Sequence, residues 1–483
     1  MATSETLRYG TSTARWTIAA TVLGSGIAFL DGTVVNVALP AIGSDLDMSL
    51  AGLQWTVNAY LVTLSAFVLL GGSLGDRFGR RRVFVTGLVW FTVASILCGL
   101  ATTAEVLIAA RALQGVGAAL LVPGSLAIIA ASFAPEDRPK AIGAWSGWSG
   151  ISTAIGPFVG GWLVDAVSWH YVFFINVPLA AVAIAIAVRH VPESSQSVPQ
   201  PLDLGGAVLV SAALALLSYA AITRDGTAPL VAGILGVIAL VAFLAVERAV
   251  SHPMLPLRLF RSAQFTGTNL TTLAVYAGLG GVMFFLVIQL QDGLGYSALE
   301  AGAAMVPFTL LLLVLSPGAG EVSQRIGPRV PLTVGPIVAG AGILVLSGVS
   351  PGDHYTTGVL PGVLVLGLGM AITVAPLTAA VLGSVDDDMS GVASGVNNAV
   401  ARFAGLVAVA VLPALAGVGV ATVGEGFGDG YEVALRIAAA VTAVGGIVAA
   451  ALVRRAVELE TTSPAPLFQP CQDPCVEVPR RAS

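Results

Sequence analysis

Fourteen long apolar stretches run through the chain, and they constrain its fold more than any other feature. Most are long enough, at 1.5 Å per residue, for a helix that crosses a hydrocarbon core of about 30 Å. Of the 483 residues, 56% are hydrophobic and 10% are charged. Water could not solvate so much apolar surface, whereas a bilayer accepts it when backbone groups are satisfied within helices. We therefore predict an all-α membrane protein with 14 transmembrane helices, at 16–39, 53–73, 83–101, 106–132, 141–164, 171–189, 204–222, 228–246, 265–290, 301–321, 330–349, 357–383, 391–418 and 432–454.

The basic residues divide unequally between the two sides of these spans. Eighteen of the 22 fall in the tails and in the loops on one side, whereas the loops on the other side hold only Arg224. The remaining three, Arg111, Arg402 and Arg436, lie within spans. Because loops rich in Lys and Arg stay in the cytoplasm, we predict a protein of the cytoplasmic membrane with both termini inside. Met1–Arg15 has no signal-peptide pattern, so the first span should remain as a helix.

Two loops of similar sequence indicate an internal repeat. The loop after the second span reads Gly72-Ser-Leu-Gly-Asp76-Arg77-Phe-Gly79-Arg80-Arg81-Arg82, and the loop after the tenth reads Gln324-Arg325-Ile-Gly327-Pro-Arg329. Arg77, Gly79 and Arg81 thus match Arg325, Gly327 and Arg329 at a constant shift of 248 positions. We expect two six-helix halves, 16–190 and 265–454, with two inserted helices and their linkers at 191–264 and cytoplasmic tails at 1–15 and 455–483. Such repeats place the substrate site between the halves, near the midplane.

Four segments together resemble the major facilitator superfamily, in particular its 14-helix drug:proton antiporter branch of multidrug-resistance exporters. Leu30–Pro40 resembles the first-helix motif of that branch, Gly72–Arg81 the loop motif of the superfamily, and Arg111–Gly117 its fourth-helix motif. The resemblance covers all 14 spans. The fifth-helix "antiporter" motif is matched by Gly150, Gly156, Pro157, Gly160 and Gly161.

This resemblance implies the major facilitator fold and a secondary active transporter. Its expected function is proton-coupled efflux of small amphipathic or hydrophobic molecules, such as drugs and antibiotics, by alternating access. A proton-coupled importer of a nutrient or siderophore is the main alternative, and a membrane protein with a structural or sensory role is a third.

We expect no enzyme activity and no cofactor. The lone lysine, Lys140, stands in no phosphate-binding loop, so the proton gradient is the expected energy source and neither nucleotide nor nucleic acid is an expected partner. The expected partners are a small-molecule substrate, protons and the lipid bilayer. The four histidines fall in loops and offer no paired metal site. Cys471 and Cys475 lie in a Pro-rich tail, and the sequence assigns them no role.

Asp31 is the one acidic residue well inside a span, and a carboxylate in a bilayer is by default a functional-site hypothesis. Arg111 lies at a similar depth on the fourth span, which the resemblance places beside the first, so a direct or water-bridged pair is expected. We predict that this pair couples transport to protons. Two other interpretations are open: Asp31 only structures helix packing with Thr33 or Asn36, and Arg111 snorkels to the outer interface.

Polar residues on the spans that face the second half or the cavity are candidates for substrate contact. Arg402 lies near the middle of the thirteenth span, where it either meets an anionic group on a substrate or is satisfied between helices. The full expected set is Thr33, Asn36, Gln114, Asn397, Asn398 and Arg402.

The repeated loop and the fifth span are candidates for controlling conformation. In the resemblance, the loop braces the two halves on the cytoplasmic side, with Asp76 facing the N-terminus of the thirteenth span after Asp386–Asp388. The arginines Arg80–Arg82 also fit a simple topology anchor. Expected brace residues are Gly72, Asp76, Arg77, Gly79 and Arg81, and the antiporter motif should shape a seal between helices that favours export.

Overall fold

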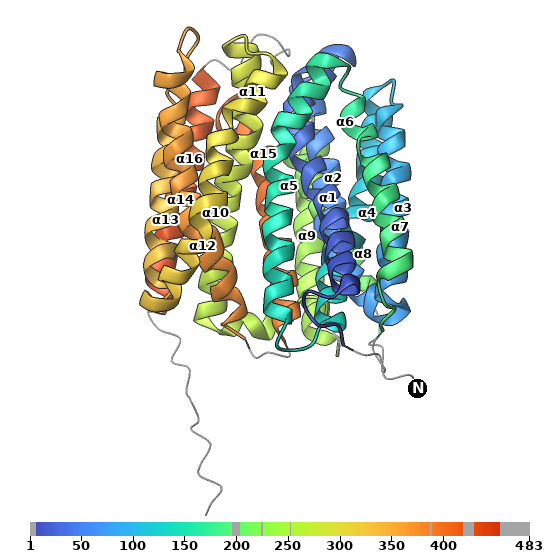
Figure 1. Ribbon diagram of the computed structural model, residues 1–483. Coiled ribbons are helices and arrows are strands. Elements are labelled where there is room, and N and C mark those ends of the chain that lie inside the picture. Colours follow the sequence, from blue (N-terminus) through green and yellow to red (C-terminus); the bar gives the residue numbers. More distant parts are fainter. Residues whose placement is uncertain are drawn as a thin grey trace, which may run out of the picture.

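The computed structural model describes residues 6–195, 203–223, 226–251, 253–385, 389–418 and 429–454, and in these the chain is helical. They hold no strand, only an isolated bridge between Leu7 and Phe133. Thirteen of the helices in these ranges are long and apolar enough to cross a membrane, and they stand side by side (Figure 1). The remaining predicted span is covered by α5 (Arg138–Ala166), whose 29 residues pack along the first helix. The all-α membrane fold is confirmed.

Polar side chains cap the N-termini of three helices in the first half. Thr11, Ser49 and Thr103 precede α1, α2 and α4, and each side chain accepts a hydrogen bond from a first-turn N–H. The helices cover most of each predicted span, and several extend beyond it, by up to six residues at the C-terminal end of α1. The helices are α1 (Ser12–Asp45), α2 (Leu50–Phe78), α3 (Arg80–Gly99), α4 (Ala104–Ser132), α5, α6 (Tyr171–Phe174) and α7 (Asn176–His190).

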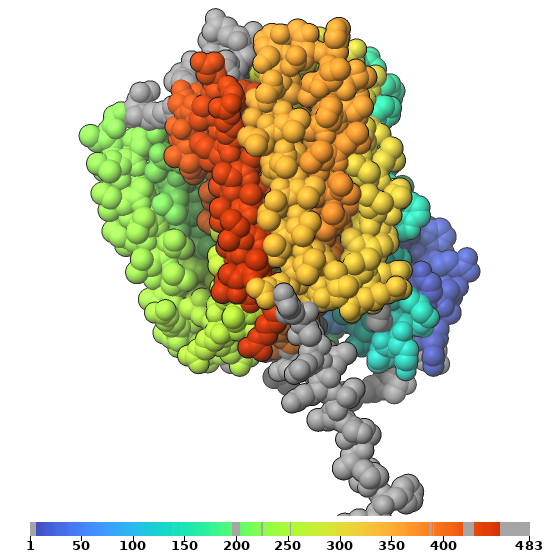
Figure 2. All heavy atoms as spheres, turned by 90° about the vertical axis from the view of Figure 1, so that its left-hand side faces the viewer, coloured from blue at the N-terminus to red at the C-terminus, as the bar shows by residue number. Residues whose placement is uncertain are grey.

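Two inserted helices, α8 (Leu204–Ile222) and α9 (Ala228–Ala249), pack on each other, and α8 also contacts α2 of the first half. In Figure 2 this pair, in green, stands at the side of the bundle next to the C-terminal helices. Apart from Arg248 in its last turn, the exposed side chains of α9 are apolar, as a lipid-facing helix requires. They include Leu230, Ile234, Val237, Ile238 and Val241.

The helices after α9, which we call the second half, have more interruptions than those of the first. Short 3₁₀ and π segments break its helices, and α2 of the first half meets α15 while α5 meets α11 and α12. Its elements are η1 (Leu257–Arg261), α10 (Ala263–Ile288), η2 (Gln289–Gly293), α11 (Ala298–Ala304), α12 (Val306–Ile326), α13 (Arg329–Leu346), η3 (Tyr355–Val359), α14 (Leu360–Leu382), α15 (Ser390–Leu415) and α16 (Asp429–Leu452).

The loops matched in sequence also match in structure. Gly79 ends α2 with φ of +103°, and Gly327 ends α12 with φ of +84°, a backbone region that favours glycine. Arg81 donates to the carbonyl of Val191 just after α7 (3.1 Å), and Arg329 donates to the carbonyl of Ala450 near the end of α16. In each half, therefore, the arginine ties the start of the third long helix to the end of the last.

The bundle has two distinct ends. Both ends of the described chain lie at one of them, at the bottom of Figure 1, together with Arg77–Arg82, and we call it the basic end. There the N-terminal segment pairs with the end of α4, since Leu7 N–H donates to Ser132 O (2.7 Å). The opposite end, which carries α11, is called the far end.

Candidate functional site

A buried ion pair joins α1 to α4 inside the first half. Asp31 is 0% exposed and Arg111 is 1% exposed, and Nη1 of Arg111 lies 2.5 Å from Oδ2 of Asp31. Two charges removed from water in this way are stable only when their remaining polar atoms are also bonded. Either partner alone would therefore be a costly buried charge.

Neutral polar side chains from three helices complete the bonding of Asp31. Gln114 of α4 donates to Oδ1 of Asp31 (2.8 Å) and to Ser95 Oγ of α3 (2.7 Å). Asn176, the first residue of α7, donates to the same Asp31 oxygen (3.2 Å). The oxygen of Gln114 in turn accepts from Arg111 (2.6 Å). Asp31 thus accepts three hydrogen bonds, so both of its carboxylate oxygens have partners.

Arg111 is held by α2 as well. Its Nε donates to Thr56 O (3.1 Å), and its guanidinium carbon lies 4.4 Å from the centre of the Tyr60 ring. Such cation–π contact is strongest when the cation is desolvated. These contacts place Arg111 inside the half rather than at an interface with lipid headgroups.

Neither Thr33 nor Asn36 forms a hydrogen bond with Asp31. Thr33 Oγ1 donates to Leu30 O (2.9 Å) and Asn36 donates to Gly32 O (3.2 Å), both within α1. The packing role considered for Asp31 therefore does not run through either residue. Ser95, Asn176 and Thr56, which no sequence pattern singled out, take those places around the ion pair.

The second half holds a neutral polar cluster. Asn397 of α15 donates to Thr272 Oγ1 (2.7 Å) and Asn269 Oδ1 (3.2 Å), both on α10. Its neighbour Asn398 bonds within α15, to Ser394 O (3.2 Å). Among the six candidate cavity residues, these two asparagines come from the second half together with Arg402.

Arg402 reaches from α15 to the first half. Its guanidinium carbon lies 5.1 Å from the centre of the Phe29 ring on α1. Within the described ranges it makes no ion pair with a carboxylate. A cation is thus placed at the boundary between the halves, next to an aromatic face.

The antiporter-motif residues of α5 make two different close approaches. A Cβ added to Gly156 would lie 1.9 Å from Thr33 Oγ1, and one on Gly160 would lie 3.0 Å from Val34 O, so both let α5 pack tightly on α1. A Cβ on Gly161 would lie 2.3 Å from Ala298 O of α11. Gly150 differs, since a Cβ there would meet nothing within 4 Å.

The two halves are in backbone contact at the far end. From the second half, a Cβ on Gly302 would lie 2.1 Å from Pro157 O, which mirrors the approach made by Gly161. Asp165, at the end of α5, accepts hydrogen bonds from the N–H groups of Ala298 (3.2 Å) and Leu299 (2.8 Å). These first-turn N–H groups of α11 have no partner within their own helix. Asp165 is exposed, as a span-end residue should be, but its bonds across the halves were not foreseen.

At the basic end, Asp76 forms an ion pair with Arg80 (2.7 Å) one turn later. The guanidinium carbon of Arg77 lies 5.5 Å from the centre of the Phe78 ring. A Cβ added to Gly72 would lie 3.7 Å from the Cβ of Pro123. Residues 386–388, which the expected brace would face, lie outside the described residues. His252, Cys471 and Cys475 lie outside them too.

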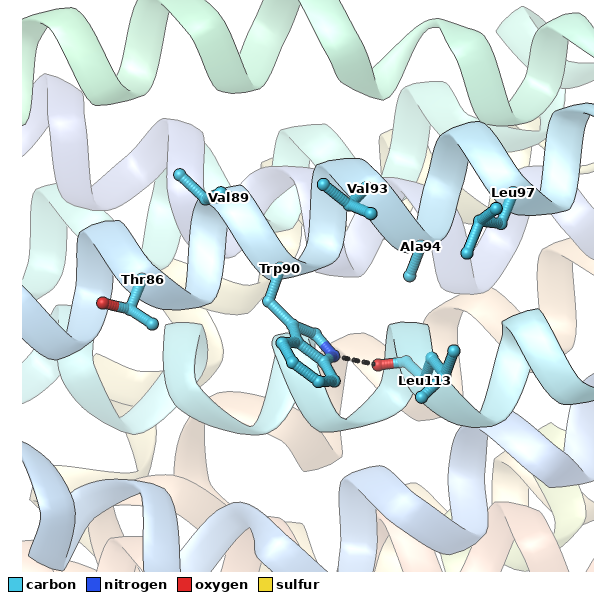
Figure 3. A pocket seen from close by; sticks show the side chains of 7 residues that line it. All are labelled: Thr86, Val89, Trp90, Val93, Ala94, Leu97 and Leu113. Atoms are coloured by element: carbon cyan, nitrogen blue, oxygen red, sulfur yellow. Dashed lines mark hydrogen bonds between the residues drawn. The ribbon is translucent and has the colours of Figure 1, made fainter.

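One apolar surface groove is separate from these residues. It lies between α3 and α4, encloses about 230 Å³, and is lined by Val89, Trp90, Val93, Leu97 and Leu113 among others (Figure 3). Trp90 Nε1 donates to Leu113 O (2.8 Å), so the indole N–H is already bonded and is not available to a ligand in the groove. Its walls suit a lipid acyl chain. In the described ranges, no group of three His, Cys, Asp or Glu side chains could hold a metal ion.

Comparison with known proteins agrees with this architecture. The sequence profile of the Major Facilitator Superfamily matches residues 21–409. The chain is 35% identical over 406 residues to "Tetracenomycin C resistance and export protein" of Streptomyces glaucescens, covering 83% of this chain and 75% of the relative. It is 36% identical over 417 residues to "Probable actinorhodin transporter" of Streptomyces coelicolor, covering 83% and 72%. The crystal structure of a peptide transporter, POT, in complex with sulfate has a TM-score of 0.69 at 15% identity, covering 93% of this chain and 96% of that one.

Proposed function

Because the chain belongs to the Major Facilitator Superfamily, a family of transporters, we propose that it exports small amphipathic or hydrophobic molecules in exchange for protons. The observation that carries this proposal is the buried pair of Asp31 and Arg111, the one ion pair in the described ranges with both side chains at most 2% exposed. A carboxylate kept in a bilayer at such cost is expected to move charge.

The proposed coupling step is a proton exchange at Asp31. A proton that binds Oδ2 of Asp31 cancels its charge and removes the ionic part of its attraction to Arg111. Arg111 remains bonded to Thr56 O and Gln114, so the guanidinium has partners while the carboxyl is neutral. When access changes sides, the proton leaves and the ion pair forms again.

The proposed cavity lies between the halves. We assign substrate contact to Thr33, Asn36, Asn397, Asn398 and Arg402. Gln114 belongs instead with the coupling site, because it is 0% exposed and bonds Asp31. Arg402 over Phe29 would offer a charged and an aromatic contact to one ligand.

Alternating access would work through the two ends of the bundle. The close contact of α5 with α11 closes the far end, and we propose that this end faces the outside, with both termini in the cytoplasm. Transport then requires that Asp165 and the Gly161 contact separate. The loop from Gly72 to Arg81 would brace the basic end while the far end is open.

Direction separates export from the alternative, a proton-coupled importer. Export is favoured by the antibiotic resistance and export named for the relative from S. glaucescens. The test uses inverted membrane vesicles with an acidic lumen and tetracenomycin C or actinorhodin as probes. An exporter that exchanges protons accumulates the probe in the lumen, and collapse of the pH gradient with an ionophore releases it. Loss of probe from preloaded vesicles under the same gradient would instead indicate a proton-coupled importer.

A further inference from the structure

The inserted helices carry two acidic side chains that face each other at the basic end. Asp203 is the N-cap of α8, and Glu247 lies in the last turn of α9, where it is only 2% exposed. Because α8 and α9 run in opposite directions and pack along each other, the start of one meets the end of the other. Neither residue belongs to the proposed coupling site or to the proposed cavity.

Each carboxyl group has one bonded oxygen and one oxygen without a partner. Asp203 Oδ1 accepts from Gly206 N–H (2.7 Å), and Glu247 Oε2 accepts from Leu255 N–H (2.9 Å). Asp203 Oδ2 and Glu247 Oε1 are buried and have no hydrogen-bond donor. Buried polar atoms are rarely left in this state.

The two unpartnered oxygens point to the same place. A Cβ added to Gly206 would lie 2.5 Å from Asp203 Oδ2 and 2.8 Å from Glu247 Oε1. The side chains are within hydrogen-bonding reach of each other. As carboxylates, however, both could only accept, and two buried negative charges at this separation would repel strongly.

No cation in the described ranges neutralises them. Arg248 follows Glu247 but is exposed, and the charged residues on α2 and α15, which pack against α8, are Asp76, Arg77 and Arg402. The segment after α9 adds Arg258 and Arg261, of which Arg258 contacts Met389. None of these forms an ion pair with Asp203 or Glu247.

We propose that Asp203 and Glu247 form a binding site for one proton, carried by Glu247 and donated in a hydrogen bond to Asp203. The proton sits on Oε1 of Glu247 and bonds Oδ2 of Asp203, so one hydrogen bond gives both unpartnered oxygens a partner. The pair then holds a single negative charge.

The helix ends determine which residue carries the proton. Asp203 lies at the N-terminus of α8, where the helix dipole and the Gly206 N–H favour an anion. Glu247 lies at the C-terminus of α9, where the dipole disfavours an anion, and it is the more buried of the two. The charge therefore stays on Asp203.

This proton links folding stability to pH independently of any transport. The folded pair keeps a proton that separated, solvated carboxyls release at neutral pH, so the unfolded state binds fewer protons. Stability should then be full in mild acid and fall as pH rises through the range in which the folded pair loses its proton. The link ties α8, α9 and the segment at Leu255 together.

The test compares amide variants of the full-length protein in lipid nanodiscs. Glu247→Gln donates an N–H to Asp203, and Asp203→Asn, an equally good N-cap, donates to Glu247, so both replace the proton with a fixed donor. The matched control is Glu432→Gln, which alters an exposed carboxyl on α16. The first readout is the thermal unfolding midpoint, measured between about pH 6 and 9 to follow how stability depends on pH. The second is the infrared carbonyl stretch of a protonated carboxylic acid.

We expect the wild type and Glu432→Gln to lose thermal stability as pH rises, and both amide variants to lose that dependence. The protonated-carboxyl band should vanish in Glu247→Gln and remain in the control. Glu247→Ala should lower the midpoint at every pH, because Asp203 is left without a donor. Equal pH slopes in the wild type and Glu247→Gln would overturn the proposal. So would a midpoint that Na⁺ or Ca²⁺ raises in the wild type but not in Glu247→Gln, since the site would then hold a metal cation.

Discussion

The first half buries a carboxylate against a guanidinium, whereas the buried polar residues described in α10–α16 are all neutral. The frames are alike: Gly79 and Gly327 turn the chain in the same backbone region, and Arg81 and Arg329 tie matching helices. The internal repeat has therefore kept the geometry of the halves and not their chemistry. A neutral cluster can stabilise packing or contact a ligand, whereas a carboxylate can also bind and release a proton.

The largest effect should come from Asp31→Asn. Asparagine keeps the shape and accepts hydrogen bonds but binds no proton, so pH-gradient-driven uptake into inverted vesicles should disappear. Arg111 is left as a buried charge, which costs about 3–5 kcal/mol of stability. The double variant Asp31→Asn with Arg111→Gln removes that charge and should recover stability without recovering transport. If either variant still concentrates substrate using only a pH gradient, Asp31 is not the coupling residue.

Asn397→Ala is the matched change in the second half. It removes hydrogen bonds to Thr272 and Asn269, each worth about 1 kcal/mol. We expect a lower affinity or rate that depends on the substrate, with coupling to the gradient retained. If correctly inserted Asn397→Ala lost all coupling to the gradient, coupling would not be confined to the charged site of the first half.

A smaller effect is expected from Arg111→Lys. Lysine keeps the positive charge near Asp31, but its single ammonium cannot reproduce the contacts of Arg111 with Gln114, Thr56 O and the Tyr60 ring. Losing one such bond costs about 1–1.5 kcal/mol, so transport should slow by roughly tenfold. Flux measured against pH in proteoliposomes should keep its shape in this variant. Arg111→Ala, which removes the charge as well, should slow transport further than Arg111→Lys.

Most of the fold could be predicted because a helix in lipid must satisfy its own backbone. The expected span 204–222 coincides with α8 (Leu204–Ile222), and 171–189 differs by one residue from α6 and α7 taken together, Tyr171–His190. The span 141–164 is less typical, because α5 is rich in Gly and Ser and does not appear among the 13 apolar helices. Charge asymmetry, rather than hydropathy alone, supported its place in the count.

The site was predictable only where charge made a residue conspicuous. Asp31 and Arg111 stand out in apolar spans, whereas Ser95 and Asn176 look like the small polar residues that usually bond their own helix. Whether such a residue bonds Asp31 depends on the rotation of its helix and on its depth in the membrane. A hydropathy pattern predicts neither the rotation nor the depth. The contacts of Asp165 and Glu247 could not be predicted either. Acidic residues at span ends are normally solvated, so their presence there did not indicate a contact.

Asp165→Asn tests whether the first half also supplies the charge that holds the far end together. The amide loses the charge that favours the N-terminus of α11, an interaction worth about 0.3–1 kcal/mol, so the population open at the far end should rise roughly two- to fivefold. Accessibility of a cysteine placed near Ala298 to a membrane-impermeant reagent measures this. Asp353→Asn is the control, because Asp353 bonds Ser350 within its own far-end loop and joins no halves. Equal labelling of both variants and the wild type would exclude a role for the Asp165 contact.

The smallest effect separates the two copies of the shared frame. Arg81 bonds Val191 O and lies 3.6 Å from Glu193, whereas Arg329 bonds Ala450 O and has no ion pair among the described residues. Arg81→Gln should therefore lower the free energy of unfolding slightly more than Arg329→Gln does. The expected difference is about 0–1 kcal/mol, which is what a partly solvated ion pair contributes. Thermal midpoints in low and high salt measure this, since salt should shrink the difference by screening the Glu193 contact. Glu193→Gln should make the two arginine variants equivalent. A difference that persists in high salt and in Glu193→Gln would mean that the carbonyl bonds themselves differ, and the frame would then be less symmetric than its sequence repeat.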